Sequence, residues 1–171
     1  DHRDLHSFPT RRSSDLWNLS ATNCMNNAPY SNDALALAHR SLCGNGSITA
    51  LVNSVPGAAG WAGVTMRERM SPEAKKVQLT TNRTNFHRRE VRFNTGGNSE
   101  VQQFASAQRY WLRLVRQGNQ FSAYVSSNGT KWFLAYSANV TMNNCIEVGL
   151  VLYNQTANST ASAVFSNVIV S

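Results

Sequence analysis

The chain has few of the residues that mark repetitive, fibrous or membrane-spanning proteins. Its 171 residues include only 10 Gly and 4 Pro, which excludes a collagen-like or low-complexity chain. No apolar run approaches the roughly 18 residues that a membrane-spanning helix needs, so we expect no membrane insertion. Neither helical heptads nor an internal repeat of about 20 to 50 residues is present, which argues against a coiled coil or a solenoid.

Acidic residues are also scarce. The chain has 16 Lys and Arg against 9 Asp and Glu, a formal net charge of +7, and Asp33 is its single Asp after position 16. A basic balance suits nucleic acid, acidic glycans or anionic surfaces, but no nucleic-acid recognition motif accompanies it. The lack of Asp disfavours a carboxylate-rich calcium loop, and no His or Cys spacing fits zinc. We therefore expect no cofactor and no metal site, although calcium bound by backbone carbonyls stays open.

The first sixteen residues differ from the rest of the chain. They read DHRDLHSFPTRRSSDL and resemble, at every position, the translation of a short-read sequencing adapter. We interpret residues 1–16 as a non-native adapter-derived tail that makes no packed contacts with the fold. The alternative is a natural disordered basic tail. A single domain is then expected at residues 17–171.

Alternation of apolar and polar residues dominates the remaining sequence, as in half-buried antiparallel strands. Turn signals such as Gly118-Asn119 and Asn128-Gly129 separate the alternating runs, and the second predicts a tight hairpin. The pattern predicts an all-β antiparallel sandwich or jelly roll. The clearest alternating runs are 48–52, 64–68, 77–81, 90–94, 111–115, 121–126 and 146–153.

Five sequence blocks follow one another in order along the chain: 44–52, 62–68, 111–118 with 121–124, 128–132 and 163–168. They are similar to DUF1349-like modules, a family of concanavalin A-like lectin/glucanase β-sandwiches appended to bacterial secreted and cell-surface proteins. The resemblance implies an antiparallel jelly roll that lacks its first strand or two, which would precede Trp17. Because this superfamily holds lectins, glycosidases and inert spacers, the fold alone does not fix the function.

Catalytic groups are not indicated. Retaining glycosidases of this superfamily place carboxylates at alternate positions of one strand so that two of them share a cleft. No such E-x-D-x-E pattern occurs, and His39 and His87 suggest no Ser-His-Asp arrangement. We therefore predict that the protein is not an enzyme. Surface ion pairs are the expected role of the isolated acids Glu68, Glu73, Glu90, Glu100 and Glu147.

The most informative candidate site combines Arg and aromatic side chains that fall on the non-core face of strands expected to be adjacent. Aromatic rings stack on sugars, and guanidinium groups bind hydroxyls or carboxylates. The alternative is a solvated sheet face on which Trp111 lies half-buried against a neighbouring domain. The candidate ligand-binding residues are Arg67, Gln78, Arg88, Glu90, Arg92, Trp111, Arg113 and Tyr124.

Three cysteines allow one disulfide. Cys43 and Cys145 each lie close to the start of a predicted strand, where two loops meet at one end of a sandwich, so we favour this pair. A Cys24–Cys43 bond and no bond are the alternatives. The resemblance to secreted modules implies an extracellular or cell-surface location, and in such a location one Cys pair is expected and one Cys is left over.

Together these features favour a non-catalytic carbohydrate-binding or adhesion module of a larger secreted or cell-surface bacterial protein. Its expected partners are a glycan or polysaccharide and the neighbouring domains of the parent chain. A glycoside hydrolase remnant and a structural spacer without a ligand are the alternatives.

Overall fold

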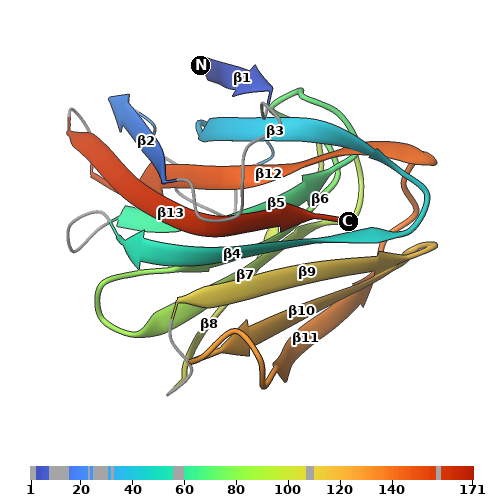
Figure 1. The fold of residues 1–171 in the computed structure, drawn as a ribbon. Coiled ribbons are helices and arrows are strands. Elements are labelled where there is room, and N and C mark those ends of the chain that lie inside the picture. The colour runs from blue at the N-terminus through green and yellow to red at the C-terminus, as the bar shows by residue number, and fades with distance from the viewer. Residues whose placement is uncertain are drawn as a thin grey trace.

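The chain forms two β-sheets packed face to face (Figure 1). A computed structural model describes residues 16–22, 24, 31, 33–55, 60–106, 110–156 and 159–171, together with the backbone of residues 3–7. No helix that could span a membrane occurs in this part of the chain. The alternating sequence pattern thus forms strands, as predicted.

The seven-stranded sheet contains six antiparallel strands and one parallel edge strand. Its strand order is β1 (Arg3–Ser7), β3 (Ala36–Cys43), β12 (Cys145–Asn154), β5 (Gly60–Arg67), β6 (Lys76–Thr81), β7 (Phe86–Arg92) and β8 (Glu100–Ala105).

The six-stranded sheet is antiparallel throughout. Its strand order is β11 (Phe133–Asn139), β10 (Gln120–Ser126), β9 (Trp111–Gln117), β4 (Gly46–Ser54), β13 (Thr160–Val170) and β2 (Trp17–Thr22).

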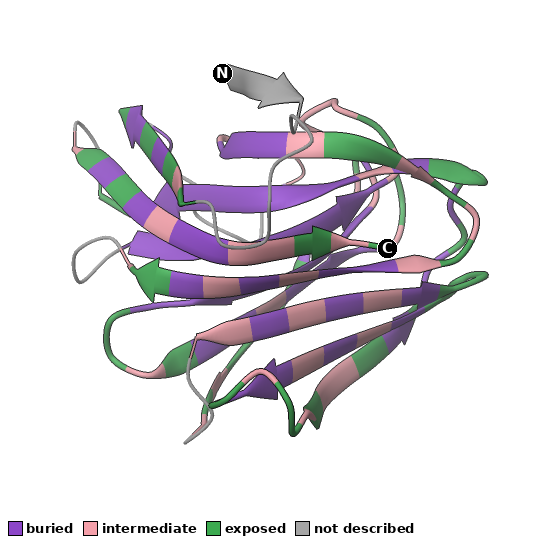
Figure 2. Ribbon diagram, in the orientation of Figure 1, coloured by how far each residue is buried: buried purple, intermediate pink, exposed green. Residues whose placement is uncertain are grey.

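The main apolar core lies between the two sheets. Val64 and Leu79 project into it from the seven-stranded sheet, and Ile48, Leu112 and Phe121 from the six-stranded sheet, all fully buried. Figure 2 shows buried and partly exposed residues alternating along β4, β9 and β10, whereas β5 and β12 are buried almost throughout. The six-stranded sheet therefore leaves its outer face open, whereas the central strands β12, β5, β6 and β7 of the seven-stranded sheet are buried on both faces.

The predicted disulfide is confirmed. Cys43, at the end of β3, lies opposite Cys145, at the start of β12, and the two sulfur atoms are bonded. Cys24 is buried and is not part of the disulfide.

The predicted hairpin at Asn128-Gly129 is also present, because β10 and β11 pair on either side of it. Its connection, residues 127–132, is longer than the two residues that we expected.

The N-terminal segment departs from expectation. The backbone of β1 pairs in parallel with β3 at the edge of the seven-stranded sheet, so the prediction that residues 1–16 avoid the fold is wrong for residues 3–7. Unpaired backbone groups at the edge of a sheet accept an extended segment with little regard to its sequence. The adapter interpretation and the domain at residues 17–171 stay predictions, and residues 1, 2 and 8–15 lie outside the described part of the chain.

Candidate functional site

The eight predicted ligand-binding residues lie on two different faces of the sandwich. β7 belongs to the seven-stranded sheet and β9 to the six-stranded sheet, so the prediction of one shared sheet is wrong. Arg67, Gln78, Arg88, Glu90 and Arg92 lie on the outer face of the seven-stranded sheet, whereas Trp111, Arg113 and Tyr124 lie on the outer face of the six-stranded sheet.

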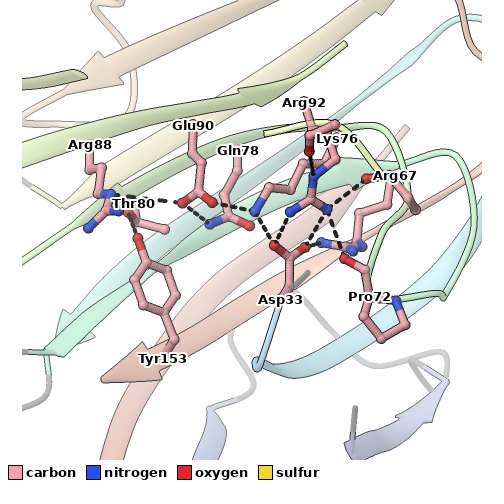
Figure 3. A network of polar contacts seen from close by, with 12 residues as sticks. Asp33, Arg67, Pro72, Lys76, Gln78, Thr80, Arg88, Glu90, Arg92 and Tyr153 are labelled. Carbon is pink, nitrogen blue, oxygen red and sulfur yellow. Dashed lines mark hydrogen bonds and ion pairs between the residues drawn. The ribbon is translucent and has the colours of Figure 1, made fainter. Parts of the chain in front are cut away.

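The first five join Asp33 and Lys76 in a network that we call the buried cluster (Figure 3). Arg67, Lys76 and Arg92 are cross-strand neighbours on β5, β6 and β7. All three converge on Asp33, whose carboxylate lies 2.6 Å from Arg67 Nη1, 2.7 Å from Lys76 Nζ and 2.7 Å from Arg92 Nη2. One carboxylate thus binds three adjacent strands to the segment that precedes β3.

The charges around Asp33 outweigh the cost of its burial. Burial opposes ionisation of the carboxyl group, but the nearby charges of Lys76 and Arg67, with the hydrogen bond from Arg92, hold the pKa of Asp33 well below its usual range. Asp33 is therefore ionised at neutral pH, and its hydrogen bonds are charge-assisted on both sides.

Glu90 organises the other half of the buried cluster. Its carboxylate accepts a short hydrogen bond from Lys76 and a longer one of 3.4 Å from Gln78 Nε2, and it lies 3.8 Å from Arg88 Nε. The two carboxylates of the cluster, on Asp33 and Glu90, face four cations.

Two aromatic rings flank Arg88. Its guanidinium carbon lies 5.6 Å from the centre of the Trp61 ring and 5.7 Å from that of Tyr153, distances typical of cation–π contacts. The Tyr153 hydroxyl shares a 3.2 Å hydrogen bond with Thr80. Burial raises the pKa of Tyr153 above its usual value, so this ring stays neutral beside the cation.

The buried cluster is closed to solvent. We expected its residues on an open sheet face, yet none of them is more than 3% exposed. A second apolar cluster adjoins the buried cluster on the same sheet, and the loop after β5 closes one end through hydrogen bonds from Asp33 N–H to the Pro72 carbonyl and from Arg67 to the Ser71 carbonyl. The second apolar cluster contains Leu35, Leu37, Trp61, Val151 and Tyr153, with Met70 against it.

Asp33 and Glu90 form the one close carboxylate pair of the buried cluster. Both contact the same Lys76 ammonium, so they lie within the roughly 5 to 10 Å that glycosidases keep between catalytic carboxyl groups. A general acid needs an exposed carboxyl with a raised pKa, whereas both groups are buried and the pKa of Asp33 is lowered. The pair therefore satisfies the distance requirement without the accessibility that hydrolysis needs.

The remaining glutamates form ion pairs: those of Glu73 and Glu100 are exposed, as predicted, whereas those of Glu68 and Glu147 are partly buried. In the described part of the chain, no three His, Cys, Asp or Glu side chains gather as metal ligands would. The pairs are Glu68 with Lys75, Glu73 with Arg69, Glu100 with Arg89 and Glu147 with His39.

The accessible half of the candidate site is what we call the aromatic face: Trp111, Arg113, Tyr124 and Trp132. All four side chains are partly exposed. Arg113 and Tyr124 are cross-strand neighbours on β9 and β10. Trp132 stands edge-on to Trp111, with ring centres 6.5 Å apart, and its ring lies 5.9 Å from the guanidinium carbon of Arg113. Two rings and a cation are thus presented together on one sheet face.

An open pocket of about 350 Å³ continues the aromatic face along β9. Arg113 lines it together with polar groups from Asn45, Ser47 and Gln117. Since a strand rises about 3.3 Å per residue, Trp111 and the pocket residue Val115 lie about 13 Å apart along β9. A ligand can therefore contact the tryptophan pair and the pocket at the same time.

Gly129 supports the tryptophan pair from the β10–β11 hairpin. Its backbone has a φ of +74°, and a Cβ atom placed there would lie 2.9 Å from the Trp111 ring. Only glycine adopts this conformation at little cost, and only glycine leaves room for the ring.

Gly129→Ala is expected to destabilise the protein by about 1 to 3 kcal/mol, because a left-handed non-glycine residue costs about 1 to 2 kcal/mol and Trp111 must also move. Gly96→Ala is the matched control, since Gly96 has a φ of +72° and nothing lies within 4 Å of its Cβ position. Thermal unfolding followed by tryptophan fluorescence measures both variants. Equal losses of stability would mean that the hairpin does not hold Trp111 in place.

Sequence reasoning missed several members of both sites. Lys76 shares the strand face of Gln78 and could have been found by the same alternation. Trp132 lies three residues after Gly129 of the predicted hairpin turn, which is a usable signal. Asp33 lies outside every strand, and no local pattern marks it.

Two antiparallel sheets with a shared apolar core define an all-β jelly roll of the concanavalin A-like kind. No protein-family model and no curated protein matches the chain in sequence, so membership of the DUF1349-like family stays a prediction.

Three solved structures illustrate the fold. A functionally unknown protein from Saccharomyces cerevisiae has a TM-score of 0.73 at 14% identity, over 91% of this chain and 87% of that one. A carbohydrate binding module from Bacillus subtilis has a TM-score of 0.54 at 15% identity, over 88% and 94%. A Bacillus licheniformis β-glucanase has a TM-score of 0.52 at 10% identity, over 90% of each chain. At these identities the similarity establishes the fold alone.

Proposed function

We propose that the protein is a non-catalytic carbohydrate-binding or adhesion module that holds a glycan on its aromatic face. The observation that carries this proposal is the partly exposed group of Trp111, Arg113, Tyr124 and Trp132 beside an open polar pocket. A sugar ring has an apolar face that stacks on an aromatic ring and hydroxyl groups that need hydrogen-bond partners. The aromatic face offers the rings, and the pocket offers the polar groups.

The rigidity of the site favours binding as well. Residues 111, 113 and 124 lie within regular strands, and Trp132 lies directly before β11. Side chains on strands lose little conformational freedom when a ligand arrives, so more of the contact energy appears as affinity. Carbohydrate binding is also the role of one structural neighbour, the Bacillus subtilis module.

A non-catalytic role is supported by where the acids lie. The strands of the six-stranded sheet contain no Asp or Glu, so the aromatic face has no carboxylate on its own strands to serve as an acid or a nucleophile. The Asp33–Glu90 pair favours a glycoside hydrolase as the second candidate, but it lies on the other sheet and is buried. Incubating polysaccharides with the protein and measuring reducing ends tests this candidate, and we expect no release.

We further propose that the protein is extracellular or lies on the cell surface. Disulfides persist mainly in oxidising compartments, and Cys43 and Cys145 form one whose residues are exposed. A module of this kind serves by holding a neighbouring domain of the parent chain close to a polysaccharide.

Trp111→Ala is expected to weaken glycan binding at least tenfold, about 1.4 kcal/mol, because it removes stacking area and the edge contact with Trp132. Lys131→Ala is the control, since Lys131 is an exposed cation on the same hairpin and contributes little. A glycan array finds the ligands, and titration calorimetry with the best of them gives the affinities.

Because Trp111 also packs on the hairpin, Tyr124→Ala serves as a second variant with a smaller structural role, and circular dichroism checks that each variant is folded. Binding that survives both substitutions would remove the aromatic face as the site. A wild-type protein that binds nothing on the array would favour the structural spacer.

A further inference from the structure

Charge is distributed very unevenly between the two sheets. The six strands of the six-stranded sheet contain only two charged residues, Arg113 and Arg116, and both are positive. The donors of Arg116 are already used within the protein, because its guanidinium donates hydrogen bonds to backbone carbonyls that include those of Gly118, Asn143 and Asn144. Arg113 is the remaining charge on this sheet, and it belongs to the aromatic face.

Arg113 makes no ion pair with any described residue, including Ser171, which lines the same pocket. Its Nε atom is buried and has no hydrogen-bond partner among the described residues. In the register of the sheet, its neighbours are Thr49 on β4 and Tyr124 on β10, both uncharged. Its guanidinium is held over the Trp132 ring and at the margin of the pocket. The cation is therefore positioned by packing and left without an anion.

The acidic side chains that the structure describes are all paired elsewhere. Six acidic residues follow position 16, and each has a cationic or histidine partner on or beside the seven-stranded sheet. An anionic group from outside the described chain is therefore needed to neutralise Arg113. The acids and their partners are Asp33 and Glu90 in the buried cluster, Glu68 with Lys75, Glu73 with Arg69, Glu100 with Arg89 and Glu147 with His39.

We propose that the aromatic face selects anionic glycans, with Arg113 binding a carboxylate or sulfate group of a sugar whose ring stacks on the tryptophan pair. This inference rests on the proposed function and names the class of glycan. A guanidinium matches the planar fork of a carboxylate and equally offers parallel donors to a sulfate ester, so uronic acids and sulfated sugars share the required chemistry. The net charge of +7 adds long-range attraction for a polyanion.

Matched polysaccharides provide the test. Polygalacturonate and its methyl ester share a backbone and differ in the carboxylate, while dextran sulfate and dextran differ in the sulfate ester. We expect the wild-type protein to bind at least one anionic member about tenfold more tightly than its neutral partner, and to lose this preference progressively as ionic strength rises. The pair that shows the preference identifies the source of the anion.

Arg113→Gln separates specific recognition from general charge attraction. It removes the guanidinium but keeps a polar side chain, so binding of neutral glycans is expected to persist while the preference for the anionic member disappears. Lys131→Gln is the matched control, because it lowers the net charge equally from an exposed position on the β10–β11 hairpin, and it should keep the preference.

Failures of the two proposals give different results. Equal binding of anionic and neutral members, or equal effects of Arg113→Gln and Lys131→Gln, would overturn the selection of anionic glycans and leave carbohydrate binding intact. No binding to these four polymers or to any glycan on an array would overturn both.

Discussion

Replacing Asp33 with asparagine is expected to lower the free energy of unfolding by about 3 to 5 kcal/mol, the usual cost of removing one partner from a buried ion pair. Asp33 contacts Arg67, Lys76 and Arg92, and its side chain is fully buried. Asparagine keeps the shape of the side chain but leaves Glu90 as the one carboxylate for the four cations of the buried cluster. Urea unfolding at pH 7 measures the difference.

The control for this substitution is Glu100→Gln, which breaks the more exposed pair with Arg89 and should change stability by less than about 1 kcal/mol. Similar losses of stability for the two variants would show that the ion pairs of the buried cluster stabilise the fold no more than exposed ion pairs do.

The pH dependence of the Asp33 effect follows from the direction of its pKa shift. The folded-state pKa lies below the value of about 3.9 for an unfolded aspartate. The ionised group therefore stabilises the fold fully above about pH 4, and this contribution is lost as the pH falls through the folded-state pKa. The stability difference between the wild type and Asp33→Asn should be constant above about pH 5 and shrink below about pH 4.

Loss of the disulfide is expected to have an effect of similar size. The bond joins Cys43 and Cys145 across a sequence separation of 102 residues, and closing a loop of that length stabilises a fold by roughly 4 to 5 kcal/mol in the chain-entropy model. The double variant Cys43→Ser, Cys145→Ser should show a correspondingly lower urea midpoint and a slope that is equal or steeper, because the unfolded chain without the crosslink is more expanded and exposes more surface.

Reductant provides the control for the disulfide prediction. It should lower the midpoint of the wild type toward that of the double variant and leave the double variant unchanged. A wild type insensitive to reductant, with peptide mapping that finds no Cys43–Cys145 link, would contradict the pairing.

The sequence predicted strands and their two faces better than it predicted burial. Leu112, Leu114 and Phe121 occupy the core as the alternation indicated, because the opposite face of the six-stranded sheet is open to solvent. The same alternation failed to show that Arg88 and Arg92 are buried. Their cover comes from residues distant in sequence, and a local pattern contains no information about it.

Alternation also could not assign strands to sheets. It places Arg88 and Trp111 each on the outer face of its strand, which is correct, but the two strands belong to opposite layers because the chain crosses over between them. The candidate site therefore divided into a buried half and an accessible half. Asp33, which decides the character of the buried half, is a single residue in a polar segment and becomes recognisable only from its three cationic neighbours.

The positions of the last two strands have a consequence for how the protein is made. β12 lies inside the seven-stranded sheet, between β3 and β5, and β13 lies inside the six-stranded sheet, between β4 and β2. A chain emerging from the ribosome cannot complete either layer until residues 145–171 have been synthesised, so apolar strand faces stay uncovered while the preceding strands are made. Such late, long-range pairing slows folding and prolongs exposure to aggregation. Cells that produce this domain must therefore keep the nascent chain apart from its neighbours until its final strands arrive.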